Sequence, residues 1–155
     1  MDKKRLILWI AVILTLAFIF SQSLLNQKIS NKESKIVKET IVRPVHEAVT
    51  GSKKVPFDVR DVAHIVEFTV LGFELVLLFK NRNRILHTVR SVSYCGMVAL
   101  IDESIQDFSG RAPQVVDIWY DILGAVVGVG IGGLLAVIIG NTKSKNKLNM
   151  GKVIK

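Results

Sequence analysis

The sequence contains few of the residues on which several protein classes depend. It has one cysteine, Cys95, so no disulfide can form within the chain and a small disulfide-stapled scaffold is excluded. It shows no internal repeat and no low-complexity stretch, and 13 Asp and Glu stand against 21 Lys and Arg. The resulting charge of +8 could indicate nucleic-acid binding. Long apolar runs explain the charge better, because membrane proteins concentrate Lys and Arg in cytoplasmic loops, and we therefore expect no nucleic-acid partner.

Apolar residues are gathered in runs that are long enough to enter a bilayer. Residues 6–20 contain a single non-apolar residue, Thr15, and residues 122–139 contain no polar side chain. Such runs are too apolar for an ordinary soluble surface, and about 20 helical residues cross the hydrocarbon core. We therefore expect an all-α fold, a four-helix transmembrane bundle formed by a single domain over 1–155. The predicted spans are 6–25, 59–79, 85–105 and 115–139.

The distribution of Lys and Arg predicts the orientation of these spans. With a cytoplasmic N-terminus, the inner segments are 1–5, 80–90 and 141–155, and the outer segments are 22–61 and 102–114. Basic residues are denser in the inner set, which places both termini and the basic tail in the cytoplasm. The basic start also resembles that of a signal peptide, but no small-x-small cleavage site follows the first run, so we expect this span to be retained.

The first outer loop carries a different pattern. Ile36, Val37, Ile41 and Val45 recur at near-helical spacing. The other positions around them carry the charged residues Lys32, Glu33, Lys35, Lys38 and Glu39. This pattern predicts a short amphipathic helix that lies on the outer membrane interface. Pro44 is expected to kink or end this helix, because proline cannot donate a backbone hydrogen bond.

Ionisable residues occur inside the predicted spans, where each charge is costly and needs a partner or a function. In the second span, Arg60, His64 and Glu67 lie three or four positions apart and share one helix face. In the fourth span, Asp117 and Asp121 share a face in the same way. Interhelical hydrogen bonding is the plain explanation for each residue taken alone, but it does not explain why the set gathers toward one side.

The alternating directions of the spans bring these polar blocks to the outer side of the membrane. The third span runs outward and ends in Asp102, Glu103 and Gln106, while the second and fourth spans begin there. Asp102 and Glu103 point about 100° apart, so we expect one of them to face inward. The residues expected to form an outer-side polar pocket are Arg60, His64, Glu67, Asp102, Glu103, Gln106, Arg111, Asp117 and Asp121.

Small residues continue the polar face of the fourth span. Gly124, Gly128 and Gly132 recur every fourth position, a spacing that lets a neighbouring helix approach closely. We expect them to serve helix packing, and the same ladder is compatible with a homodimer.

At these residues the sequence resembles the VanZ-like family of small bacterial membrane proteins. The matching blocks are Phe20-Ser21-Gln22-Ser23, Arg60 to Phe68 with Leu71-Gly72, and Asp102 to Gln106 with Arg111, Asp117, Asp121, Gly124-Ala125 and Gly128. The resemblance implies a multi-pass protein of the bacterial plasma membrane. The family is named for a member associated with resistance to the glycopeptide antibiotic teicoplanin, and the resemblance implies no reaction mechanism.

Three kinds of function are compatible with this sequence. In the first, the pocket binds a membrane lipid, a lipid-linked cell-wall precursor or an amphiphilic antibiotic, and so acts on the cell envelope and reduces susceptibility to glycopeptides or lipoglycopeptides. In the second, a membrane enzyme uses His64 as general base, with Glu67, Asp102 or Glu103 as its partner, on a lipid-linked envelope substrate. In the third, the pocket holds a divalent cation or a proton. No spacing matches a recognised metal motif, so we expect neither a metal nor a cofactor.

Overall fold

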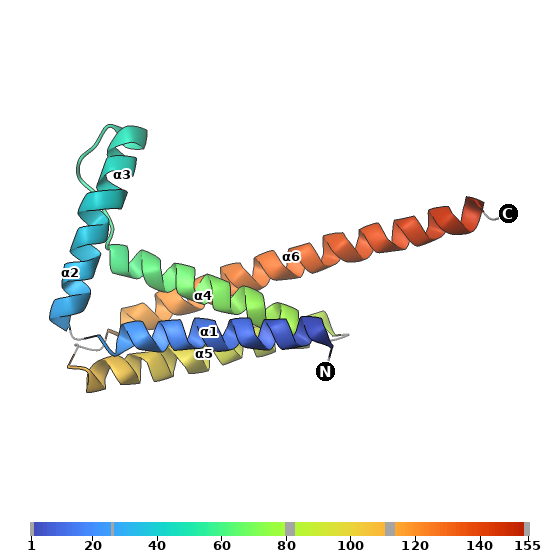
Figure 1. Cartoon of the computed structure of the whole chain (residues 1–155), viewed down its shortest axis with the longest axis horizontal. Helices are drawn as coiled ribbons and strands as arrows, with labels where there is room; N and C mark the ends of the chain where they lie inside the picture. The colour runs from blue at the N-terminus through green and yellow to red at the C-terminus, as the bar shows by residue number, and fades with distance from the viewer. Residues whose placement is uncertain (1, 26, 80–82, 111–113, 154–155) are drawn as a thin grey trace.

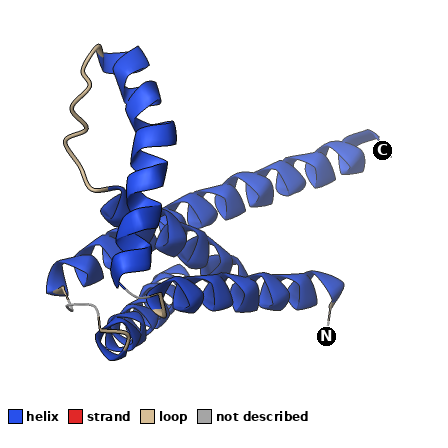
Figure 2. Cartoon of the chain, turned by 60° about the vertical axis from the view of Figure 1, so that its left-hand side comes forward, coloured by secondary structure: helices blue, strands red, loops and turns tan. Residues whose placement is uncertain are grey.

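The computed structural model of the chain describes residues 2–25, 27–79, 83–110 and 114–153, and over these residues it is helical without a strand (Figures 1 and 2). The elements in chain order are α1 (Lys3–Ser23), α2 (Gln27–Val37), the π-helical turn η1 (Lys38–Val42), α3 (Arg43–Thr50), α4 (Val59–Leu78), α5 (Arg84–Phe108) and α6 (Val115–Val153). The all-α prediction is therefore confirmed.

Four long helices, α1, α4, α5 and α6, begin within a few residues of the four predicted spans. α6 continues beyond the predicted end of its span to Val153, through most of the basic tail. By length and apolar composition, α1 and the Val115–Ile138 part of α6 could each cross a membrane. α4 and α5 have a comparable length but contain more ionisable and polar residues.

The pairing of α4 with α6 is the most extensive helix contact of the bundle, and glycine makes it possible. A Cβ added at Gly124 or Gly128 would overlap a backbone carbonyl oxygen of α4, and one at Gly132 would overlap the Val76 side chain. Gly72 of α4 has the reciprocal position, where a Cβ would lie 2.6 Å from a carbonyl oxygen of α6. Small residues therefore allow these two backbones to touch, as the four-residue spacing predicts.

Apolar side chains occupy both the centre and the outside of the bundle. A buried core joins α1, α4, α5 and α6 through Val12, Ile19, Phe68, Leu71, Leu75, Leu78, Cys95, Ala99 and Ala125. On the outward faces, large apolar side chains remain exposed, including Ile7 at 65%, Leu14 at 65% and Leu134 at 61%. A soluble protein rarely leaves so many large apolar residues in contact with water, so these faces suit a lipid environment.

The segment between α1 and α4 forms a helical arm, α2–η1–α3, that stands at the end of the bundle away from both chain termini (Figure 1). The arm is longer than the short helix expected from the sequence, and it does not end at Pro44. A π-helical turn directly before α3 accommodates the proline, which cannot donate a regular helical hydrogen bond. The arm ends at Gly51, whose φ of +72° is a left-handed conformation that favours glycine.

The close approach of α4 and α6 predicts that alanine substitution lowers the stability of the protein at Gly128 but not at the nearby Gly130. Gly128→Ala should lower the free energy of unfolding by about 1–3 kcal/mol, because its methyl group overlaps the carbonyl oxygen of Thr69. Gly130→Ala is the control, since a Cβ there meets nothing within 4 Å. Thermal unfolding of the purified variants in detergent measures both effects. An equal response of the two variants would contradict the packing described.

Candidate functional site

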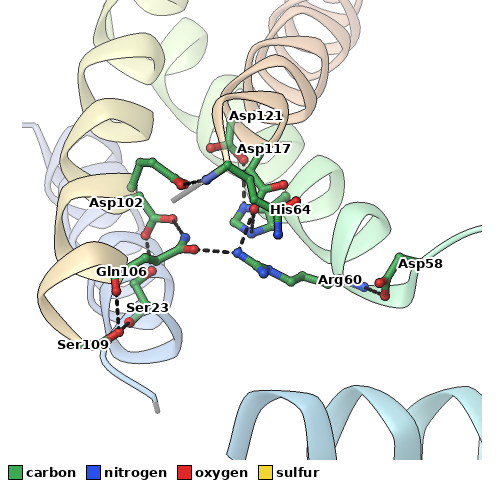
Figure 3. A network of polar contacts seen from close by, with 11 residues as sticks. Ser23, Asp58, Arg60, His64, Asp102, Gln106, Ser109, Asp117 and Asp121 are labelled. Atoms are coloured by element: carbon green, nitrogen blue, oxygen red, sulfur yellow. Dashed lines mark hydrogen bonds and ion pairs between the residues drawn. The ribbon is translucent and has the colours of Figure 1, made fainter. Parts of the chain in front are cut away.

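The ends of four helices meet at the end of the bundle where the arm stands, and they bring together one polar cluster (Figures 1 and 3). α1 and α5 run toward this end of the bundle, whereas α4 and α6 start from it (Figure 1). The chain therefore contributes its polar residues from the last turns of two helices and the first turns of the other two. The buried or half-buried members are Ser23, Arg60, His64, Asp102, Gln106, Asp117 and Asp121.

Arg60 links three of these helices. Asp58 caps α4 by accepting a hydrogen bond from the Arg60 backbone N–H at 3.1 Å, which fixes the start of the helix. The Arg60 Nη2 donates to Gln106 Oε1 at 2.6 Å and to Asp117 Oδ2 at 2.7 Å. The Asp117 side chain is only 3% exposed and that of Arg60 19%, so this ion pair is largely shielded from solvent. Removing either partner would leave a poorly solvated charge behind.

His64 lies one turn further along α4 and pairs with Asp121 of α6. Its Nδ1 is hydrogen-bonded to Asp121 Oδ1 at 2.9 Å, and its Nε2 lies 3.9 Å from Asp117 Oδ2. The side chains of His64 and Asp121 are 7% and 2% exposed. A carboxylate on one ring nitrogen orients the imidazole and determines which nitrogen faces the rest of the cluster.

Asp102 of α5 connects the cluster to the end of α1. The Ser23 hydroxyl donates to Asp102 Oδ1, and the Gln106 Nε2 donates to Asp102 Oδ2 at 2.6 Å. Ser109, just beyond α5, donates its hydroxyl to the Ser23 carbonyl oxygen at 3.0 Å. The Gln106 amide therefore bridges Asp102 and Arg60, and the network runs without interruption through all four helices.

A cavity of about 470 Å³ opens beside this network, between the bundle and the arm. Apolar side chains form part of its wall, namely Phe18, Ile36, Val37, Val59 and Ala63. The polar part consists of Gln22, Ser23, Ser30, Glu33, Ser34, Arg60, His64, Glu67 and Gln106. The cavity can therefore accept a molecule with both an apolar and a polar portion.

The structure places most of the expected pocket residues here and resolves one ambiguity. Asp102 is the inward-facing member of its pair, at 1% exposure, whereas Glu103 accepts a hydrogen bond from the Gln114 backbone N–H at the loop side. Glu67 lines the cavity. Arg111 lies outside the described residues.

One group of side chains has the ligand chemistry of a cation site. Ligand atoms of His64, Asp102 and Asp121 lie within 4.8 Å of one another, and all three residues are buried. An imidazole with two carboxylates can hold a divalent transition metal. Each oxygen of Asp102 also accepts one hydrogen bond, from Ser23 and from Gln106, which leaves lone pairs free on both oxygens. Nothing in the described residues tests the expectation of no metal, which stays a prediction.

Ser23 and several residues of the arm line the cavity but are not among the residues that the sequence predicts for the pocket. Ser23 belonged to a visible polar block at the end of the first apolar run, but its spacing did not distinguish it from a solvated helix end. Glu33 and Ser34 looked like the polar side of an amphipathic helix. Ser30, Glu33, Ser34 and Val37 share one helix face by their spacing, and this spacing was the sequence feature that could have identified them. The spacing alone does not show that the bundle lies opposite this face.

Comparison with known proteins identifies the family of the chain. No curated protein and no solved structure matches the chain significantly. The model of the VanZ/LLP1 family matches residues 6–137, a range that contains α4, α5, the whole polar cluster and the whole arm, and most of α1 and α6. The chain therefore belongs to the VanZ/LLP1 family.

Proposed function

We propose that this chain is a multi-pass membrane protein of the cell envelope that binds an amphiphilic envelope component in the cavity beneath the arm. The observation that carries the proposal is the combination in one cavity of an apolar wall with a buried, charged hydrogen-bond network. Family membership supports an envelope-related role.

The packing of the helices supports the proposal of a four-span topology. If α1 and α6 cross the bilayer, then α4, which packs against both, and α5, which packs against α6, lie at the same depth. Helices of 20 and 25 residues are about 30 Å long or more, enough to span the hydrocarbon core. Both termini then lie on the same side, in the cytoplasm by the positive-inside rule, and the arm faces outward.

Cysteine accessibility tests this orientation. In a Cys95→Ala background, Ser52→Cys beyond the arm should react with a membrane-impermeant maleimide added to intact cells. Lys4→Cys near the N-terminus should react only after the membrane is permeabilised. Both positions are exposed, so burial does not prevent labelling. Labelling of both cysteines in intact cells, or of neither, would contradict the proposed topology.

The chemistry of the cavity favours a ligand with a hydrocarbon part and a polar head. Phe18, Ile36, Val37 and Val59 offer apolar contact, while the Arg60 guanidinium and the His64 imidazole offer polar contact. Membrane lipids and lipid-linked cell-wall precursors have this character. Lipoglycopeptide antibiotics share it, and reduced susceptibility to such antibiotics is the finer form of the proposal.

Filling the cavity should abolish binding. A phosphatidylcholine with a photoreactive acyl chain, in vesicles containing the purified protein, should label the peptide that contains Val59, which lines the cavity and is less exposed to the surrounding lipid than Phe18 at 53%. Ala63→Trp should remove this labelling, because the indole fills space that the apolar wall encloses. Val62→Trp is the matched control, since Val62 is 40% exposed and lies outside the cavity lining. Equal labelling in the wild type and the Ala63→Trp variant would refute the assignment of the cavity.

A second candidate function, catalysis, is favoured by the geometry of His64. A general base needs a second group to orient it and access to a substrate, and His64 both pairs with Asp121 at 2.9 Å and lines the cavity. With a carboxylate partner, the imidazole can take a proton from water or from a hydroxyl of a bound envelope substrate.

Replacement of His64 separates binding from catalysis. His64→Gln keeps a hydrogen-bonding side chain but cannot transfer a proton, so a catalytic role predicts complete loss of product with photolabelling retained. Lipid extracts of cells that produce the wild type or the variant at equal membrane abundance, compared by mass spectrometry, provide the measurement. A lipid change that persists in His64→Gln would exclude proton transfer at this residue.

A further inference from the structure

A second cavity of about 340 Å³ adjoins the first on the other side of Arg60. Arg60 and Ser34 line both cavities, so the guanidinium lies at their junction. The second cavity has a polar lining throughout: Asn31, Ser34, Lys35, Lys38, Asp58, Arg60 and Gln114.

The arm contributes its residues to this cavity from one helix face. Asn31, Ser34, Lys35 and Lys38 lie three, one and three positions apart, which places them on a single side of the arm. This side faces the starts of α4 and α6, because the opposite wall consists of Asp58, Arg60 and Gln114. The two lysines therefore line an open cavity that the bundle borders on its other side, although Lys35 itself remains exposed.

The charge in the second cavity is positive. Lys35, Lys38 and Arg60 supply three cations, and Asp58, the acidic residue of the lining, already accepts a hydrogen bond as the N-cap of α4. Asp117 balances the charge of Arg60 from outside this lining, so the two lysines supply the excess positive charge. The Arg60 Nε atom is buried and has no hydrogen-bond partner among the described residues. A buried N–H donor without an acceptor is costly, so the site favours a ligand that brings acceptor oxygens.

We propose that this cavity binds the phosphoryl group of an amphiphile, with Lys35 and Lys38 of the arm and Arg60 of α4 as its recognition residues. The inference rests on the proposed function, because the hydrocarbon part of the same molecule occupies the adjoining apolar-walled cavity. A phosphoryl group fits because it presents several charged acceptor oxygens to an arginine fork and to lysine ammonium groups. Asn31, Ser34 and Gln114 add polar groups around the same oxygens.

A comparison of three probes tests this site by calorimetry on the full chain in non-ionic detergent. The probes are dioleoyl phosphatidic acid, dioleoyl glycerol and inorganic phosphate. We expect phosphatidic acid to bind about tenfold more tightly than dioleoyl glycerol, because each lysine near an anionic headgroup contributes measurably to affinity. The double variant Lys35→Gln, Lys38→Gln should lower the affinity for phosphatidic acid by about tenfold and leave that for dioleoyl glycerol unchanged.

The control is the double variant Lys53→Gln, Lys54→Gln, which removes the same charge from an exposed loop outside both cavity linings. Equal binding of the two lipids by the wild type, or equal losses in the two double variants, would overturn the proposal. Binding of inorganic phosphate alone, with the same dependence on Lys35 and Lys38, would establish the anion site for free phosphate. If inorganic phosphate binds and neither lipid binds, the proposal that the protein binds an amphiphile is refuted, and so is the proposal that the phosphoryl group belongs to a lipid.

Discussion

The architecture depends on the requirement that charges removed from water be paired. Arg60 satisfies this requirement for three helices, because its guanidinium binds Gln106 of α5 and Asp117 of α6 from the first turn of α4. Asp102 extends the network to Ser23 at the end of α1. Each of these groups is satisfied only when the four helix ends are in register, so the network determines the relative depth of the helices as well as the polarity of the site.

The two binding proposals follow from the position of the arm beside this hydrogen-bond network. The bundle holds the polar groups in a hydrogen-bonded network, and the arm lies on one side of them and borders two cavities that share Arg60. One cavity has an apolar wall and reaches His64, whereas the other is polar and lined by lysines. An amphiphile matches this division, since its hydrocarbon and its anionic head need surroundings of opposite character at a short distance from each other.

Much of this arrangement was accessible from residue spacing. The periodic positions of Arg60 and His64, and of Asp117 and Asp121, predicted two polar faces, and the alternating directions of the spans predicted that these faces meet. The glycine ladder predicted a close helix contact. Spacing could not choose between Asp102 and Glu103, because adjacent helical residues differ only in direction and the direction of the neighbouring helix is not written in a local pattern.

The sequence by itself determined the helical class, the approximate starts of the four long helices and the set of ionisable residues that need partners. Hydrophobic periodicity and the cost of burying a charge are properties of local sequence, so they can be recognised without the fold. Tertiary structure decided which carboxylate pairs with which cation, that α4 packs on α6, and that the arm borders two cavities. The first two outcomes depend on contacts between residues more than 40 positions apart, such as Arg60 with Gln106 and Asp117. No local pattern specifies such contacts, since they arise only when all four helices satisfy their buried polar groups together.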